Sequence, residues 1–230
     1  MSFFLFAVFP YCALLLAAAG GICRYAAERS SYSSFSSQLL EKRVLFWGSV
    51  SFHYGIVLVL AAHLFSALFS RQEDALLLGS PPRLYLVEAV GASLGILTLF
   101  GIVLLILRRL VYSPVARATT VMDWVLLAAL LCQAVSGTYI ALFERWGVLW
   151  YHYTAVPWFR SLFALSPRIE LMAPLPWIIK FHAVNAFALI ALFPFTRLVH
   201  IVTVPLSYLW RPFQVVIWNK RIQGRTERRE

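Results

Sequence analysis

Long apolar runs with few charged positions dominate the pattern of hydrophobic and polar residues along this chain. A helix needs about 20 apolar residues to cross the hydrocarbon core of a bilayer, so a run of that length predicts a membrane-spanning helix. The runs occupy residues 3–23, 44–69, 84–107, 121–143 and 177–204. The pattern therefore predicts an all-α membrane protein, a bundle of five transmembrane helices, with residues 1–230 forming a single transmembrane domain.

The composition supports the same class. Hydrophobic residues make up 61% of the chain and charged residues only 13%, which excludes an ordinary soluble domain. The first run has no basic segment before it and no clear small-residue cleavage site, so it is expected to be a retained helix and not a signal peptide.

The formal net charge of +10 raises the possibility of nucleic-acid binding, but the positions of the basic residues favour a topological explanation. Most of the lysines and arginines lie in the first and third connections between runs and in the C-terminal segment. By the positive-inside rule, the N-terminus is expected outside and the C-terminus in the cytoplasm of a bacterial or archaeal cell. Residues 206–230 are expected to form a basic cytoplasmic tail that binds membrane lipids or an acidic partner, and no nucleic acid.

Two pairs of histidines stand inside the apolar runs. His182 and His200 are 18 residues apart, which is five helical turns, so one continuous helix would carry them on one face roughly 27 Å apart. His53 and His63 are ten residues apart in another run, a rise of roughly 15 Å. Each of the two helices is therefore expected to present an imidazole at two depths of the membrane.

This arrangement favours haem over a single metal ion. A zinc or copper site needs three or four ligands at one point, whereas two antiparallel helices place two histidines at each of two separate points. His53 and His200 are expected to hold one haem towards the cytoplasm, and His63 and His182 a second towards the outside. A tilt of the helices or a kink at Pro194 is expected to reconcile the unequal rises. Without a CxxCH motif, the haems would be non-covalent and of the b type.

Other polar residues can be interpreted either as structural or as functional. The arginines near the cytoplasmic side are candidates for pairing with haem propionates, although topology alone also accounts for them: Arg108, Arg109, Arg117 and Arg197. His152 lies in an aromatic-rich connection and is expected to be an interfacial side chain. The four membrane histidines have a rival interpretation as isolated residues of a transporter, or as a proton relay in a haem-free membrane anchor.

Three stretches carry a resemblance to a known family. They are FHYGIVLVLAAHLF at 52–65, RRLVYSPVARATT at 108–120 and FPFTRLVHIVTVPLSYL at 193–209. Set in five expected helices, they resemble the gamma subunit of respiratory nitrate reductase, a membrane cytochrome b, over essentially the whole chain. The resemblance implies the same pairing, His53 with His200 and His63 with His182.

The resemblance also implies a reaction. It implies that the chain, as the quinol-oxidising subunit of an enzyme complex, takes electrons from quinol near the outer haem. The electrons would pass to an iron–sulfur beta subunit and on to a molybdenum-containing alpha subunit that reduces nitrate. Arg83, Tyr85 and Glu88 are candidates for the quinol site, with Arg83-Leu84-Tyr85 standing where the family has a lysine associated with quinol binding. A related dihaem subunit of another oxidoreductase, linked to sulfite or heterodisulfide reduction, is the alternative within this class.

Overall fold

The computed structural model describes residues 1–27, 40–75, 79–144 and 147–203, and this part of the chain is helical without strands. Within it, five helices are long and apolar enough to cross a membrane. They are Phe4–Ala27 (η1, Phe4–Val8, with α1, Phe9–Ala27), α2 (Arg43–Leu68), α4 (Pro81–Val111), α6 (Val121–Phe143) and Trp177–Phe195 (α9, Trp177–Leu192, with η5, Phe193–Phe195). The predicted five-helix membrane bundle is confirmed. The predicted tail at 206–230 lies outside the described residues.

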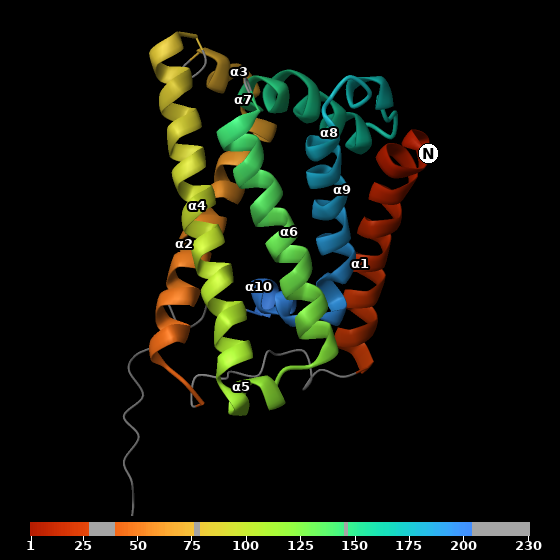
Figure 1. Cartoon of the computed structure of the whole chain (residues 1–230). Coiled ribbons are helices and arrows are strands. Elements are labelled where there is room, and N and C mark those ends of the chain that lie inside the picture. Colours follow the sequence, from red (N-terminus) through yellow and green to blue (C-terminus); the bar gives the residue numbers. More distant parts are fainter. Residues whose placement is uncertain (28–39, 76–78, 145–146, 204–230) are drawn as a thin grey trace, which may run out of the picture.

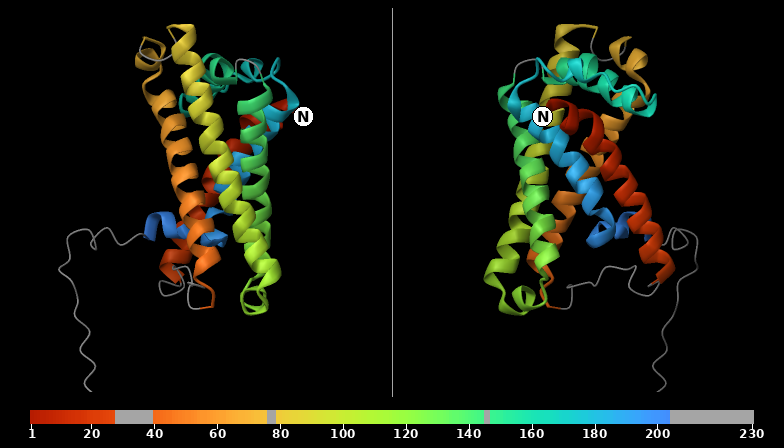
Figure 2. Two further views of the ribbon diagram at one scale, coloured as in Figure 1. Left: turned by 60° about the vertical axis from the view of Figure 1, so that its left-hand side comes forward. Right: turned by 90° about the vertical axis from the view of Figure 1, so that its right-hand side faces the viewer.

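The membrane-spanning helices pack in a row that differs from their order in the sequence. α2 packs on α4, α4 on α6, α6 on α9, and α9 on α1 (Figure 1). Short helices close one end of the bundle, here called the α8 end, where the N-terminus also lies (Figure 2). They are α3 (Ser70–Glu73), α7 (Gly147–Trp150), η3 (Tyr151–Ala155) and α8 (Val156–Phe163). The opposite end, with α5 (Ser113–Arg117), is called the α5 end.

Glycines set the closest contact in the bundle, between α2 and α4. A Cβ atom on Gly101 of α4 would lie 2.7 Å from the Cα atom of Phe52, and one on Gly55 of α2 would lie 2.8 Å from the backbone nitrogen of Thr98. Only glycine permits this approach of the two backbones. The contact fixes α2 on both sides of His53.

The fifth membrane helix is not continuous, and the prediction of one helix over 177–204 is wrong. α9 ends at Leu192 and is followed by η5, by η6 (Arg197–Val199) and by the short α10 (His200–Thr203). Pro194 has no N–H group, and its ring clashes with the carbonyl one turn earlier, so the α-helix stops there. Thr196 then adopts an extended conformation (φ −125°, ψ −178°). His200 therefore lies on a separate helix and not on the face of α9 that carries His182.

Helix α1 holds this break in place. A Cβ atom on Gly20 would lie 2.8 Å from Cγ of Pro194, so the glycine makes room for the proline ring. Arg24 donates a hydrogen bond of 2.6 Å to the carbonyl of Pro194. The contacts satisfy a backbone group that the interrupted helix leaves open.

A tryptophan of the aromatic-rich connection anchors α8 in the core. The indole of Trp158 is buried, donates to the carbonyl of Phe6 at 2.9 Å and packs edge-on against the rings of Phe6 and Phe187. The short helices at this end are thus packed onto α1 and α9.

Candidate functional site

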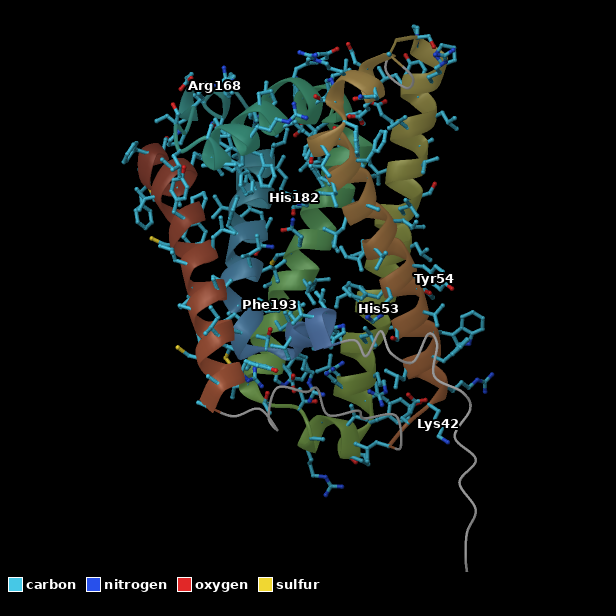
Figure 3. The ribbon with its side chains drawn as sticks, turned by 180° about the vertical axis from the view of Figure 1, so that it is seen from behind. Lys42, His53, Tyr54, Arg168, His182 and Phe193 are labelled. Atoms are coloured by element: carbon cyan, nitrogen blue, oxygen red, sulfur yellow. The ribbon has the colours of Figure 1, made fainter. Side chains whose placement is uncertain are left out.

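The rings of His53 on α2 and His200 on α10 face each other, with centroids 6.0 Å apart and an interplanar angle of 70°. Figure 3 shows His53 on the side of α2 that faces α10. Nδ1 of His53 donates to the carbonyl of Ser49 at 2.7 Å, and Nδ1 of His200 donates to the carbonyl of Arg197 at 2.5 Å. A carbonyl only accepts, so both rings carry the proton on Nδ1 and keep a lone pair on Nε2.

The separation of the two rings is of the size expected for two imidazoles that hold one metal. A metal–imidazole bond is about 2 Å long, so a metal bound between two imidazoles separates their ring centres by roughly 6 Å. A hydrogen bond from Nδ1 to a carbonyl is also the usual way in which a protein orients a ligating histidine. The break at Pro194 and Thr196 brings His200 to this position. The two residues fit the haem that the sequence assigned to them.

At the other depth, His63 of α2 has the same arrangement. Its Nδ1 donates to the carbonyl of Val59 at 2.8 Å. The ring of Tyr151 packs against the ring of His63 with centroids 4.7 Å apart, and the Tyr151 hydroxyl donates to the His63 carbonyl at 2.9 Å. Tyr151 of η3 therefore contacts both the ring and the backbone carbonyl of His63.

His182 of α9 lies in a polar network with α6, in the half of the bundle nearer the α8 end (Figure 3). Its Nδ1 is 2.9 Å from the hydroxyl of Ser136, which itself donates to a backbone carbonyl, so Nδ1 is the donor. Its Nε2 is 3.0 Å from the amide nitrogen of Gln133, whose oxygen accepts from Asn185 at 2.7 Å. A Cβ atom on Gly137 would lie 2.8 Å from the His182 ring, which thus rests on the backbone of α6.

The four membrane histidines therefore share one tautomer, with Nδ1 protonated and the lone pair on Nε2. None of the four side chains is buried, so each ring has surface that a bound group can cover. The rings of His63 and His182 are not in contact in the described part of the chain, and the Gln133 amide holds Nε2 of His182. Before Nε2 of His182 could hold a metal, the Gln133 amide would have to turn away from it.

Two of the four arginines predicted near haem propionates form ion pairs with acidic residues. Arg108 is buried and donates to the carboxylate and carbonyl of Glu41 at 2.8 and 2.9 Å. Arg197 forms a two-point ion pair with Asp123 at 2.5 and 3.0 Å. Of the other two, Arg109 is partly buried and donates to the carbonyl of Leu105, while Arg117 is exposed. The propionate role stays a prediction for all four.

The predicted quinol contacts lie at the start of α4. Arg83 and Tyr85 are exposed there, and Glu88 is half-buried. At 3.6 residues per turn, Tyr85 and Glu88 lie about 60° apart round the helix, whereas Arg83 is roughly 140° from Glu88. The helix therefore places Tyr85 and Glu88 on one side and Arg83 on another.

His152 is not an interfacial side chain, and its role was missed in the sequence. It is buried, and its Nδ1 lies 3.0 Å from Oε2 of the buried Glu73. Next to this pair, the Tyr153 hydroxyl donates to Oδ1 of Asp74 at 2.6 Å. No signal in the sequence links the doublet Glu73-Asp74 to the doublet His152-Tyr153, which lies in another connection.

The tyrosines on either side of His152 keep their protons. Burial raises the pKa of the Tyr151 phenol, and the charge of Glu73 raises it further. The hydrogen bond to Asp74 raises the pKa of Tyr153. Both phenols are therefore hydrogen-bond donors at neutral pH.

Comparison with known proteins finds one family and several related proteins of similar description. The family described as nitrate reductase gamma subunit matches residues 2–219. The chain is 34% identical to the nitrate reductase gamma chain of Bacillus subtilis over 222 residues, which cover 94% of this chain and 97% of the relative. It is 38% identical to the nitrate reductase-like protein NarX of Mycobacterium tuberculosis over 220 residues, or 93% of this chain, but it spans only 33% of the length of NarX.

A more distant relative belongs to another oxidoreductase. The chain is 29% identical over 116 residues to one subunit of the dihydromethanophenazine:CoB–CoM heterodisulfide reductase of Methanosarcina acetivorans. The match covers 50% of this chain and 38% of the relative.

Proposed function

The chain belongs to the nitrate reductase gamma subunit family, and from this membership we propose that it is the dihaem cytochrome b subunit of a quinol-oxidising respiratory nitrate reductase. It is a multi-pass bacterial membrane protein. In this proposal His53 and His200 hold one b haem, and His63 and His182 hold the other. The haems, when bound, supply one-electron transfer between quinol and a partner subunit.

The residues around the histidines have defined tasks in this proposal. The carbonyls of Ser49, Val59 and Arg197 orient three of the rings through Nδ1, so that Nε2 is presented to iron. Ser136 orients His182 in the same way. Gln133, which bonds to Nε2 of His182, must turn away when that nitrogen binds iron.

The two ends of the bundle differ in their tasks. The α8 end faces the periplasm, in accordance with the positive-inside rule, and quinol reacts there beside the His63–His182 pair. Tyr85 and Glu88 contact quinol from one side of α4, with Arg83 at the headgroup level. The α5 end, with its arginines, binds the iron–sulfur beta subunit, which feeds the molybdenum-containing alpha subunit. Electrons cross inward and protons leave outward, so turnover builds a membrane potential.

The 6.0 Å separation of the His53 and His200 rings is the observation that carries this proposal. The test is the haem content of the purified chain by acid–acetone extraction and pyridine haemochrome. We expect two extractable b haems per chain in the wild type. A value near one, or haem that stays with the protein, contradicts the proposed pairing, and a haem-free chain leaves the membrane-anchor function.

The match to a heterodisulfide reductase subunit favours a second candidate, a dihaem subunit of another quinone-linked oxidoreductase. Both candidates use the same histidines, so haem content does not separate them. Affinity purification from native membranes does, because the nitrate reductase candidate requires co-purification of a molybdenum-containing subunit. Its absence, with another iron–sulfur partner present, favours the second candidate.

A further inference from the structure

Three consecutive residues at the α8 end connect the His63 ring to the surface. Tyr151 contacts the His63 ring and carbonyl, His152 pairs with Glu73, and Tyr153 bonds to Asp74. Tyr151 is half-buried, the Glu73 and His152 side chains are only 8% and 6% exposed, and the next residues along the chain, Asp74 and Tyr153, are exposed. A titratable pair therefore lies between a proposed haem ligand and solvent.

The chemistry of the pair is that of an oriented base. A carboxylate bonded to Nδ1 of an imidazole fixes the ring, leaves a lone pair on Nε2 and stabilises the imidazolium that forms when Nε2 takes a proton. Uptake of one proton at Nε2 changes the net charge of the pair from −1 to 0. Tyr151 has a different task, because its hydroxyl donates to the His63 carbonyl.

We propose that the Glu73–His152 pair is the base that accepts protons from quinol during its oxidation at the α8 end and releases them to water at that end. This inference rests on the proposed function. In each turnover two O–H bonds of the quinol break, two electrons leave towards the oxidised haems, and two protons leave in succession through Nε2 of His152. The quinone departs without them.

Other charged or titratable groups surround this pair and contribute to any pH dependence. They lie on α2, which packs against α3, on α3 and the residue after it, on η3, on α8, which packs against η3, and on α4, which packs against α7: His63, Arg71, Asp74, Arg83, Glu88, Tyr151, Tyr153 and Arg160. His152 is the one of the five histidines that the proposed haem ligation does not use.

The test is the rate of haem reduction by a soluble quinol analogue, measured by stopped flow across a range of pH in the purified complex. His152→Gln keeps a side chain that can bond to Glu73 but cannot accept a proton, and it is expected to slow reduction about 100-fold. Glu73→Gln is expected to slow it less, because the imidazole remains. The pH profile of the rate is expected to differ between the wild type and His152→Gln, because glutamine cannot accept a proton.

The neighbouring pair provides a matched control. Asp74→Asn combined with Tyr153→Phe removes a hydrogen bond between the same two segments and leaves the Glu73–His152 pair intact. If His152 merely fastens η3 to α3, the control slows reduction as much as His152→Gln does, and the inference is overturned. It is equally overturned if His152→Gln keeps both haems, the wild-type rate and the wild-type pH profile.

A measurement on the unmodified protein covers the case in which the variants lose haem. Redox-induced infrared difference spectra of the complex with 13C-labelled histidine should show an imidazolium band on addition of quinol. Its absence at every pH overturns the inference. A wild type without two haems, or with haems that quinol does not reduce, contradicts the proposed function itself.

Discussion

The imidazole rings of His53 and His200 lie 6.0 Å apart although one belongs to α2 and the other to a short helix beyond the break in the fifth membrane segment. Each ring is oriented by a hydrogen bond from Nδ1 to a carbonyl of the turn before it. The fold itself therefore brings the two rings together.

Replacement of either histidine by alanine should remove the same haem. We expect His53→Ala and His200→Ala each to leave one haem per chain, and the double variant to lose no more than either single variant, because one iron needs both ligands. Tyr54→Ala, at an exposed neighbouring position, is the control and should retain two haems. Haemochrome quantitation decides, and additive losses in the double variant would contradict the pairing.

Substitution of Gly101 should force α2 away from α4. Its Cβ atom would lie 2.7 Å from the Cα atom of Phe52, a backbone atom that no rotamer change can move, so Gly101→Ala should cost at least about 1–3 kcal/mol, the usual range for overpacking. Gly91→Ala is the matched control in the same helix, because a Cβ atom there meets nothing within 4 Å. Thermal unfolding in detergent measures both. Equal unfolding temperatures for the two variants would show that α2 and α4 can move apart at little cost in stability.

The sequence predicted the membrane helices because their length and apolarity are local properties. α6 begins and ends at the residues expected, and Thr120 caps it, with Asp123 completing the capping box. The fifth segment differed because its course after Pro194 depends on Gly20 and Arg24 of α1, which lie far away in the sequence. The spacing argument paired His200 with His53, whose ring is its neighbour in the structure, but placed it on a continuous helix.

The sequence could not reveal the Glu73–His152 pair for a related reason. The two residues are 79 positions apart in connections where hydropathy sets no register. Only the packing of α2 and η3 at the α8 end brings them together. An isolated histidine in an aromatic-rich segment resembles an interfacial residue until its partner is known.

The basic C-terminal segment should bind the partner subunit. Residues 206–230 combine aromatic residues with arginines at the end expected in the cytoplasm, which suits an acidic protein surface. Deletion of these residues should release an iron–sulfur subunit from the membrane while both haems remain, because the four histidines all precede the deletion. Membrane fractionation and haem spectra test this together. Retention of the subunit would limit the segment to a lipid anchor.

Acid should weaken the anchorage of α2 at the α5 end. Burial opposes ionisation of Glu41, but N–H groups of Val44, Leu45 and Arg108 bond to its carboxylate and hold the pKa of Glu41 below its ordinary value of 4.5. A pKa that is lower in the folded state stabilises the fold at pH values above the ordinary pKa. That stabilisation is lost as the pH falls from 4.5 through the lowered value.

The unfolding temperature of the wild type should therefore fall over this acidic range, and the profile of Glu41→Gln should be flatter. Glu170→Gln removes an exposed carboxylate at the other end of the bundle and serves as the control. Parallel profiles for wild type and Glu41→Gln would show that the Glu41–Arg108 pair contributes no pH-dependent stability.

Asp123 should control how firmly the chain holds the haem between His53 and His200. Its carboxylate binds the Arg197 side chain at two points, and the Arg197 carbonyl accepts the hydrogen bond that orients His200. Asp123→Asn removes the charge from this chain of contacts, so η6 and His200 lose their attachment to α6. Loss of an outer-shell contact to a metal ligand typically weakens metal binding by roughly 10- to 100-fold, and we expect a loss of that size for this haem.

Thr120→Ala separates this effect from helix capping. It removes the side-chain cap that Thr120 gives to Asp123 N–H and should cost about 1 kcal/mol of stability, but it leaves the Asp123–Arg197 ion pair in place. The measurement is the rate at which each variant transfers haem to excess apomyoglobin in detergent. Faster transfer of one haem from Asp123→Asn, with Thr120→Ala close to wild type, identifies the ion pair as the element that positions His200. Equal rates for the two variants would assign the effect to the end of α6 and not to Arg197.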